Sequence, residues 1–312
     1  MDVNINNFDK ILELVFSKSS LQKKKLTKYL ETKDEAFFKS AEEFATDYIS
    51  FISNQNISLE SAVDAYIKMC NDMLVSQLYF NKTGKYPAEN AENAFKDVYN
   101  NEVEMKSYMV GLAISQFLWS THYKMYQFFL ENIGNQSDKI SSYLEIGPGH
   151  GLFLKDAYKI VVEKGNNVRF KAIDISQTSL DLSQSIVNLL IGKNNIDFAV
   201  MDALKYNEEE SFDFITMGEV LEHVDFPDKL LSKINRLLTD NGVAFISTCI
   251  NCPSIDHVYH FRCANEIHDI LSKNDLIVKS ELFLPVEDLP MDVIIKKKIT
   301  INYCAIVSKK GF

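Results

Sequence analysis

The sequence predicts an α/β fold in which a mostly parallel sheet of seven strands follows an all-helical N-terminal region. From residue 143 onward, short apolar runs alternate with amphipathic segments, which is typical of βαβ units and a parallel sheet. A glycine-rich turn follows the first of these runs. The first 130 residues instead have apolar side chains at helical spacing and a single proline, Pro87. We therefore expect a helical region over residues 1–130 and an α/β domain over residues 131–312.

The N-terminal region contains several helical patterns. Apolar residues recur at helical spacing over residues 12–16 and 41–49. Ser58, followed by an acidic residue and an apolar run to residue 69, indicates a third helix. The segment Met105–Leu130 is apolar almost all round, so we expect a helix that is buried on several sides between this region and the following domain.

Seven extended segments are expected in the α/β domain. Pro227 begins a helix before the fifth of them, because proline fits the first helical turn, and Asp240-Asn241-Gly242 ends that helix. The last two segments have no clear helix between them, so we expect an antiparallel pair at the sheet edge. The segments are Tyr143–Ile146, Val168–Ile173, Ile196–Val200, Phe212–Met217, Val243–Ser247, Leu276–Leu284 and Ile299–Val307.

Composition and charge narrow the class of protein. The net charge of −10 disfavours nucleic-acid binding, which needs a basic field to meet phosphates. The longest nearly apolar run, Met109–Trp119, is too short to span a bilayer, and the acidic N-terminus does not resemble a signal peptide. The five cysteines are then expected to be reduced. We expect a cytoplasmic protein that binds neither nucleic acid nor a membrane.

The glycine-rich turn is the central motif. It reads Glu145-Ile146-Gly147-Pro148-Gly149-His150-Gly151 and follows the first strand, where a parallel sheet binds ligands. Asp174 ends the second strand, in a position to accept hydrogen bonds from ribose hydroxyls. The third glycine comes one place too early for the dinucleotide pattern, so there is little reason to favour a pyrophosphate.

The region from Tyr143 to Ser308 resembles the class I S-adenosylmethionine-dependent methyltransferases in five segments. These segments are LEIGPGHGLFL, AIDIS, MDAL, FDFITMGEVLEHV and LLTDNGVAFIST, which begin at Leu144, Ala172, Met201, Phe212 and Leu237. The resemblance implies a Rossmann-like fold with an antiparallel terminal strand. It also implies methyl transfer from S-adenosylmethionine.

The same resemblance implies which residues bind the cofactor. The three glycines of the turn would line its methionine part, and Glu145 would face its amino group. Asp174 would bind the ribose, while Asp202 and Ala203 would meet the adenine. The full expected set is Glu145, Gly147, Gly149, Gly151, Asp174, Ile175, Asp202, Ala203 and Glu219.

Candidate catalytic residues lie beyond the fourth and fifth strands. His223 follows Glu222, and a histidine that titrates near neutrality is a natural general base. Asp256 and His257 lie in the loop after the fifth strand, over the same end of the sheet. We expect His223, His257 and Asp256 to act on the acceptor; a purely structural hydrogen bond is the alternative for His223.

An aromatic segment, Gln116–Tyr126, precedes the sheet. It can act as a substrate lid, with Trp119, His122 and Tyr123 facing the mouth of the cofactor site. Packing of a buried helix is the alternative.

A divalent metal is a further expectation at the acceptor. Asp256 and His257, with His122 or His223, would supply a carboxylate and two imidazoles that leave coordination positions open. Such an ion would polarise an enolisable or vicinal-oxygen substrate. A polar substrate loop without metal is the alternative.

Two cysteines raise the question of zinc. Cys249-x-x-Cys252 lies near His257, His260 and Cys263, all of which are potential zinc ligands. Because Cys249 ends a predicted core strand, we expect this geometry to be awkward for a metal.

The leading hypothesis is methylation of a small molecule at oxygen, nitrogen or carbon, in specialised metabolism or surface-sugar biosynthesis. One alternative is metal-assisted C-methylation of an enolisable acyl substrate. A non-catalytic partner subunit with the same fold is another. A homodimer is compatible with the sequence, which leaves the oligomeric state open.

Overall fold

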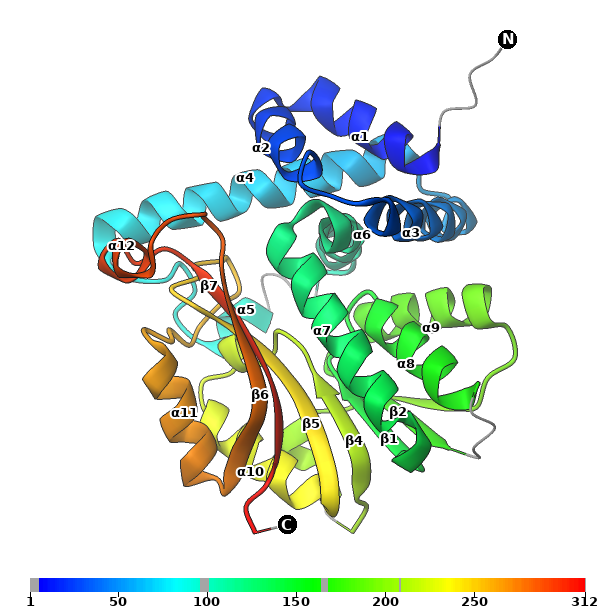
Figure 1. Cartoon of the computed structure of the whole chain (residues 1–312), viewed down its shortest axis with the longest axis vertical. Helices are drawn as coiled ribbons and strands as arrows, with labels where there is room; N and C mark the ends of the chain where they lie inside the picture. The colour runs from blue at the N-terminus through cyan, green and yellow to red at the C-terminus, as the bar shows by residue number, and fades with distance from the viewer. Residues whose placement is uncertain (1–5, 96–100, 164–167, 208, 312) are drawn as a thin grey trace.

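The computed structural model describes residues 6–95, 101–163, 168–207 and 209–311, and its centre is one seven-stranded sheet (Figure 1). The strand order is β3-β2-β1-β4-β5-β7-β6. β1 to β5 are parallel, and β7 runs antiparallel to both of its neighbours. This confirms the predicted sheet with its antiparallel terminal strand. The strands are β1 (Ser142–Ile146), β2 (Arg169–Asp174), β3 (Ile196–Val200), β4 (Phe212–Met217), β5 (Leu238–Ile250), β6 (Leu276–Pro285) and β7 (Ile301–Lys309).

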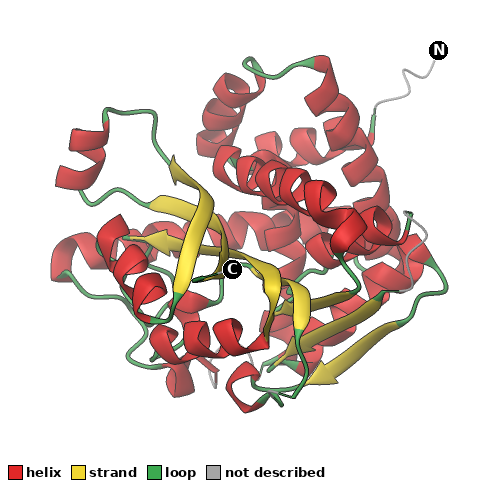
Figure 2. Ribbon diagram, turned by 60° about the horizontal axis from the view of Figure 1, so that its bottom comes forward, coloured by secondary structure: helices red, strands yellow, loops and turns green. Residues whose placement is uncertain are grey.

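Helices cover both faces of the sheet (Figures 1 and 2). Successive residues of β1 enter opposite cores, as the two-residue period of a strand requires: Tyr143 faces one core and Leu144 the other. One face packs against α7, α8 and α9, and the opposite face packs against α10 and α11. These helices are α7 (Ser120–Gln136), α8 (Leu152–Val162), α9 (Gln177–Ile191), α10 (Pro227–Leu237) and α11 (Ala264–Lys273).

The N-terminal helices form a layer across one end of the sheet, which we call the helical cap (Figure 1). Ser19, Asp34 and Ser58 cap its second, third and fourth helices by accepting a hydrogen bond from a backbone N–H of the first turn. Its core is continuous with that of α7, α8 and α9. The cap comprises α1 (Asn7–Lys18), α2 (Ser20–Leu30), α3 (Glu35–Asn54), α4 (Leu59–Thr83), α5 (Ala91–Ala94) and α6 (Glu102–Leu118).

The apolar segment Met105–Leu130 is two helices rather than the single helix that the sequence predicts. Trp119 has an extended backbone between α6 and α7, with φ −110° and ψ 122°. Its indole Nε1 donates a hydrogen bond to the hydroxyl of Tyr66 on α4, at 2.9 Å. This tertiary contact coincides with a break between two helices that the spacing of apolar residues does not reveal.

Among the described residues, no helix is both long and apolar enough to cross a membrane.

Two other predictions differ from the structure near β5 and β7. α10 ends at Leu237, but Asp240-Asn241-Gly242 lies inside β5, which begins at Leu238. These three residues lie where the pairing of β5 with β4 shifts register, between the Phe212–Leu238 and Phe214–Val243 pairs. The tail also contains α12 (Met291–Lys296) between β6 and β7, a six-residue helix too short for a periodic pattern.

Gly111 provides a test of how the cap is packed. A Cβ atom at Gly111 of α6 would lie 2.7 Å from the backbone carbon of Ala65 on α4, whereas one at Gly134 of α7 would meet nothing within 4 Å. Gly111→Ala should lower the free energy of unfolding by about 1–3 kcal/mol, because two backbones must separate. Gly134→Ala, the control, should be neutral or stabilising by up to about 1 kcal/mol. Chemical denaturation measures both, and equal effects would contradict this description of the α4–α6 contact.

Candidate functional site

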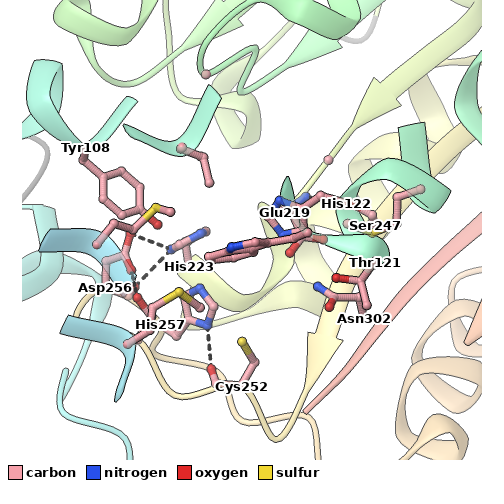
Figure 3. Close-up of a pocket in the computed structure, with 18 of the residues that line it drawn as sticks. Tyr108, Thr121, His122, Glu219, His223, Ser247, Cys252, Asp256, His257 and Asn302 are labelled. Carbon is pink, nitrogen blue, oxygen red and sulfur yellow. Dashed lines mark hydrogen bonds and ion pairs between the residues drawn. The ribbon is translucent and has the colours of Figure 1, made fainter. Parts of the chain in front are cut away.

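A cavity of about 1290 Å³ lies between the helical cap and the carboxyl ends of the parallel strands. Residues that follow β1, β2, β3, β4 and β5 line it on the sheet side, and residues of α2, α4 and α6 line it on the cap side. β7 adds Asn302, because an antiparallel strand begins where its parallel neighbours end. Figure 3 shows the polar side chains that converge on this cavity.

The glycine-rich turn forms one wall of the cavity. Gly147 has a φ of 69°, and a Cβ there would lie 2.9 Å from the Val220 side chain. The turn is fixed from both sides, since Gly147 N donates to Ile173 O at 2.8 Å and Ser183 Oγ donates to Gly149 O at 2.7 Å. Gly147 and Gly149 line the cavity, while Gly151 packs against α9. Because glycine has no side chain, a ligand can approach this backbone closely.

Glu145 is a buried acid at the end of β1 that also lines the cavity. Its carboxyl accepts a hydrogen bond from the hydroxyl of Tyr143 on the same face of the strand. Burial raises the pKa of Glu145 to about 8, and the Tyr143 bond only partly opposes this rise. A carboxyl held in this way favours a cation beside it.

Asp174 ends β2 and is 9% exposed. Its two carboxylate oxygens accept from Ser176 N and from Ser179 Oγ, each at 2.8 Å. These bonds fix its orientation, and each oxygen keeps a further lone pair. Burial raises the pKa of Asp174, whereas these bonds oppose that rise.

The remaining predicted cofactor residues also line the cavity. Asp202 precedes a short 3-10 turn and accepts a hydrogen bond from Leu204 N at 2.9 Å. Ala203, the first residue of that turn, lines the cavity next to Asp202. Ile175 is 46% exposed next to Asp174. Glu219 follows β4 with a φ of 52°, in the left-handed region, and its backbone N–H donates to Ser247. All of these residues follow the carboxyl ends of the parallel strands β2, β3 and β4.

The aromatic segment contributes only part of the expected lid. Trp119 and His122 line the cavity, but Tyr123 packs against Phe37, with ring centres 4.8 Å apart. His122 bonds to Ser115 Oγ through Nδ1 at 2.8 Å, and its burial lowers its pKa to about 3. It is therefore a neutral imidazole. Tyr108 of α6 is another cavity residue, which helical periodicity did not single out.

A second polar group lies beyond β4 and β5, and it contains all three predicted catalytic residues. The Nδ1 of His223 is 3.1 Å from the carbonyl of Asp256 and 3.5 Å from its carboxylate, and Nδ1 of His257 bonds to the carbonyl of Cys252 at 2.7 Å (Figure 3). The two imidazole rings are nearly perpendicular, with centres 4.7 Å apart. Glu222 lies behind them, fully buried, and accepts from Thr248 Oγ1 at 2.8 Å.

Glu222 was missed as a site residue by the sequence reasoning, although the Glu-x-x-Glu-His spacing from Glu219 to His223 was available as a signal. Potential ligand atoms of Glu222, His223 and His257 lie within 4.8 Å of one another, and so do those of Glu219, Glu222 and Cys249. Burial and the nearby Glu222 carboxylate raise the pKa of Glu219 well above its usual value. This end of the cavity therefore contains one more carboxyl group, that of Glu222, than the sequence predicts.

The thiols are also closer together than predicted. Cys249, Cys252 and His257 form a third group within 4.8 Å, so the end of β5 does not separate the CxxC pair. Cys249 and His257 lower the pKa of Cys252. His260 instead bonds to Asn251, and Cys263 is exposed, so neither joins this group.

The raised pKa of Glu145 makes a prediction about stability. Between about pH 5 and pH 8 the folded protein keeps this proton while the unfolded chain has lost it, so stability falls as pH rises through that window. Glu145→Gln keeps an acceptor for Tyr143 and removes the ionisation. Relative to this variant, the wild type should lose up to about 1.4 kcal/mol of unfolding free energy per pH unit. Urea unfolding without ligand measures this, and a pH-independent difference would refute the assignment.

Comparison with known proteins places these features in a family. A sequence model of the family described as "Methyltransferase domain" matches residues 120–277, half of the chain. A mitochondrial ubiquinone biosynthesis O-methyltransferase of Candida albicans is 28% identical over 120 residues, which are 36% of this chain and 33% of that protein. A malonyl-[acyl-carrier protein] O-methyltransferase of Ilyobacter polytropus is 25% identical over 112 residues, 36% of this chain and 40% of that protein. The chain thus spans less than half the length of these curated relatives.

Solved structures share the fold. The N-methyltransferase NodS from Bradyrhizobium japonicum, in complex with S-adenosyl-l-homocysteine, has a TM-score of 0.51 at 15% identity and covers 71% of this chain and 99% of its own. The phospholethanolamine N-methyltransferase 2 of Haemonchus contortus has a TM-score of 0.53 at 14% identity and covers 72% of this chain and 61% of its own. The matched sequence and the shared fold agree, and this chain belongs to the methyltransferase domain family.

Proposed function

We propose that this protein transfers a methyl group from S-adenosylmethionine to a small-molecule acceptor. The observation that carries the proposal is one cavity with two chemically different ends. Glu145, Asp174 and the glycine-rich turn line one end, and His223 and His257 line the other. Methyl transfer requires a donor site and an acceptor site in line with each other.

The residues at the first end suit the cofactor. When bound, S-adenosylmethionine supplies a methyl group on a positively charged sulfur. Asp174, held by its two serine bonds, would accept hydrogen bonds from ribose hydroxyls. Glu145 would compensate for the ammonium group of the methionine part, and the backbone of Gly147 and Gly149 would lie against that part. Asp202 and Ala203 would contact the adenine.

The residues at the second end would contact the acceptor. His223 and His257 each have Nδ1 bonded to a backbone carbonyl, so Nδ1 carries a proton in both. Burial opposes the charged form of His257, but the Cys252 side chain and nearby acids outweigh it and raise the pKa of His257 to about 10. His257 would therefore bind the acceptor as an imidazolium, and His223 would be the general base. Asp256 would position His223. The curated relatives are named as O-methyltransferases, which supports oxygen as the acceptor atom.

The helical cap, within residues 1–130, would select the acceptor and exclude water. Tyr108 and Trp119 line the cavity from the cap side. Exclusion of water strengthens the electrostatic interactions inside a closed site. The α/β region over residues 131–312 would bind the cofactor.

The ribose contact is tested by Asp174→Ala. Loss of a charged hydrogen bond should weaken binding of S-adenosylhomocysteine by roughly 1.5–3 kcal/mol, or about 10- to 100-fold. Calorimetric titration gives the dissociation constant. Asp181→Ala, on the exposed side of α9, is the matched control and should bind normally. Unchanged affinity in folded Asp174→Ala would refute this role.

The acceptor end is tested by His257→Ala. This variant should lose turnover at least about 100-fold against a panel of hydroxylated acceptors, and it should still bind S-adenosylhomocysteine. Mass-spectrometric detection of methylated product measures turnover. Full activity of this variant would show that His257, and with it the loop after β5, does not take part in the reaction. Cofactor binding by the wild type without turnover on any acceptor would favour a non-catalytic subunit.

A further inference from the structure

We propose that Glu222, His223 and His257 form a divalent-metal site whose open positions bind two adjacent oxygen atoms of the acceptor. The choice of acceptor rests on the proposed function, whereas the metal site stands on geometry alone. Potential ligand atoms of the three residues lie within 4.8 Å of one another. Two imidazoles and one carboxylate are the donor set that holds Fe²⁺ and similar ions at one face and leaves the other face open.

The orientation of both imidazoles supports this assignment. Histidines that bind a metal usually donate their other ring N–H to a carbonyl or a carboxylate. Nδ1 of His257 is 2.7 Å from the carbonyl of Cys252, and Nδ1 of His223 is 3.1 Å from the carbonyl of Asp256. The carboxylate of Asp256 is 3.5 Å from the same His223 nitrogen and is itself held by Ser254 Oγ at 2.8 Å. These bonds fix the orientation of both rings, and a metal would take the place of a proton on the other ring nitrogen.

The charge balance of the cluster also favours a cation. Glu222 is fully buried, and among the described residues its carboxylate is hydrogen-bonded to Thr248 and the Cys249 thiol. Glu219 lies close to it, with a buried Oε1 that has no hydrogen-bond partner. Among the described residues, no lysine or arginine lies within ion-pair distance of either carboxylate, and His257 is the positive group that acts on both. Buried carboxylates are normally paired with a cation or bound to a metal.

The neighbouring thiols are a weaker choice of ligand. Cys249 Sγ is 3.7 Å from Nδ1 of His257, the nitrogen that already donates to Cys252 O. A site built from Cys249, Cys252 and His257 through that nitrogen would break the 2.7 Å hydrogen bond.

The position of the ligands indicates the acceptor class. His223 and His257 line the cavity, whereas Glu222 lies behind them, so the open positions of the metal would face the cavity. A bound ion lowers the pKa of a hydroxyl group that coordinates it. An acceptor with two adjacent oxygens, such as vicinal hydroxyls or a hydroxyl beside a carbonyl, fills two open positions and orients one oxygen for methylation.

Metal binding is tested on the full chain after treatment with a chelator and dialysis. Titration with Mn²⁺, followed by calorimetry and by the paramagnetic resonance of free Mn²⁺, should give one strong site per chain. Glu222→Gln and His257→Ala should abolish it, and Asp256→Asn should weaken it about 10- to 100-fold by removing support from His223. His268→Ala removes a histidine that pairs with Glu281 on the surface, and this control should bind Mn²⁺ normally. Circular dichroism checks that each variant is folded.

Two further measurements separate the possible failures. Binding of S-adenosylhomocysteine without strong binding of Mn²⁺ would overturn the metal site and leave the proposed function standing. Strong Mn²⁺ binding without cofactor binding would overturn the proposed function, and with it the acceptor class, while leaving the metal site. Co²⁺ should give a spectrum free of sulfur-to-cobalt charge transfer. Such a band, lost in Cys252→Ser, would assign the ion to the thiols and overturn the ligand set.

Discussion

The packing of three phenylalanine rings, Phe129, Phe153 and Phe245, holds together the parts on which the site depends. Phe129 of α7 stacks on Phe153 of α8 with ring centres 4.7 Å apart, and Phe245 of β5 packs edge-on to Phe129 at 5.3 Å. α8 follows the glycine-rich turn, β5 leads into the loop of His257, and α7 continues from the helical cap. These three rings therefore join α8, β5 and α7, the elements next to the glycine-rich turn, the His257 loop and the helical cap. Aromatic side chains bury large areas with specific geometry, which suits them to such a junction.

The strands at the centre of the sheet were predictable because their signal is local. β3 and β4 have the predicted bounds, and β1 begins one residue earlier, since apolar runs between glycine and polar turns suffice to define them. The break at Trp119 was not predictable, because it coincides with a hydrogen bond to Tyr66, 53 residues earlier in the chain. The cofactor residues were named from consecutive motifs, and all except Gly151 line the cavity. Tyr108 and Asn302 escaped prediction because only the tertiary fold brings them to the site.

The two ends of the cavity use buried charge in different ways. Glu145 has a single hydroxyl partner and gains a proton through burial. The group around Glu222 instead concentrates carboxylates, thiols and imidazoles in one small volume. A neutral acid can stay buried without a charged ligand at little electrostatic cost. Several ionised acids that lie close together repel one another unless a cation lies among them. Under the proposed function and the proposed metal site, this difference in electrostatics would give each end its own ligand preference.

The reversed direction of β7 has a consequence for how such a site can diversify. Because β7 starts at the cavity, Asn302 enters the acceptor end from a segment near the C-terminus, and Thr300 just before it bonds to the carbonyl of Asn251 at 2.8 Å. The predicted cofactor residues, in contrast, all lie between Glu145 and Glu219. Under the proposed function, acceptor preference would be spread over the cap, two loops and a late strand, while cofactor binding would be confined to one stretch of the gene. Mutations can accumulate in the former and change what is methylated without disturbing the latter.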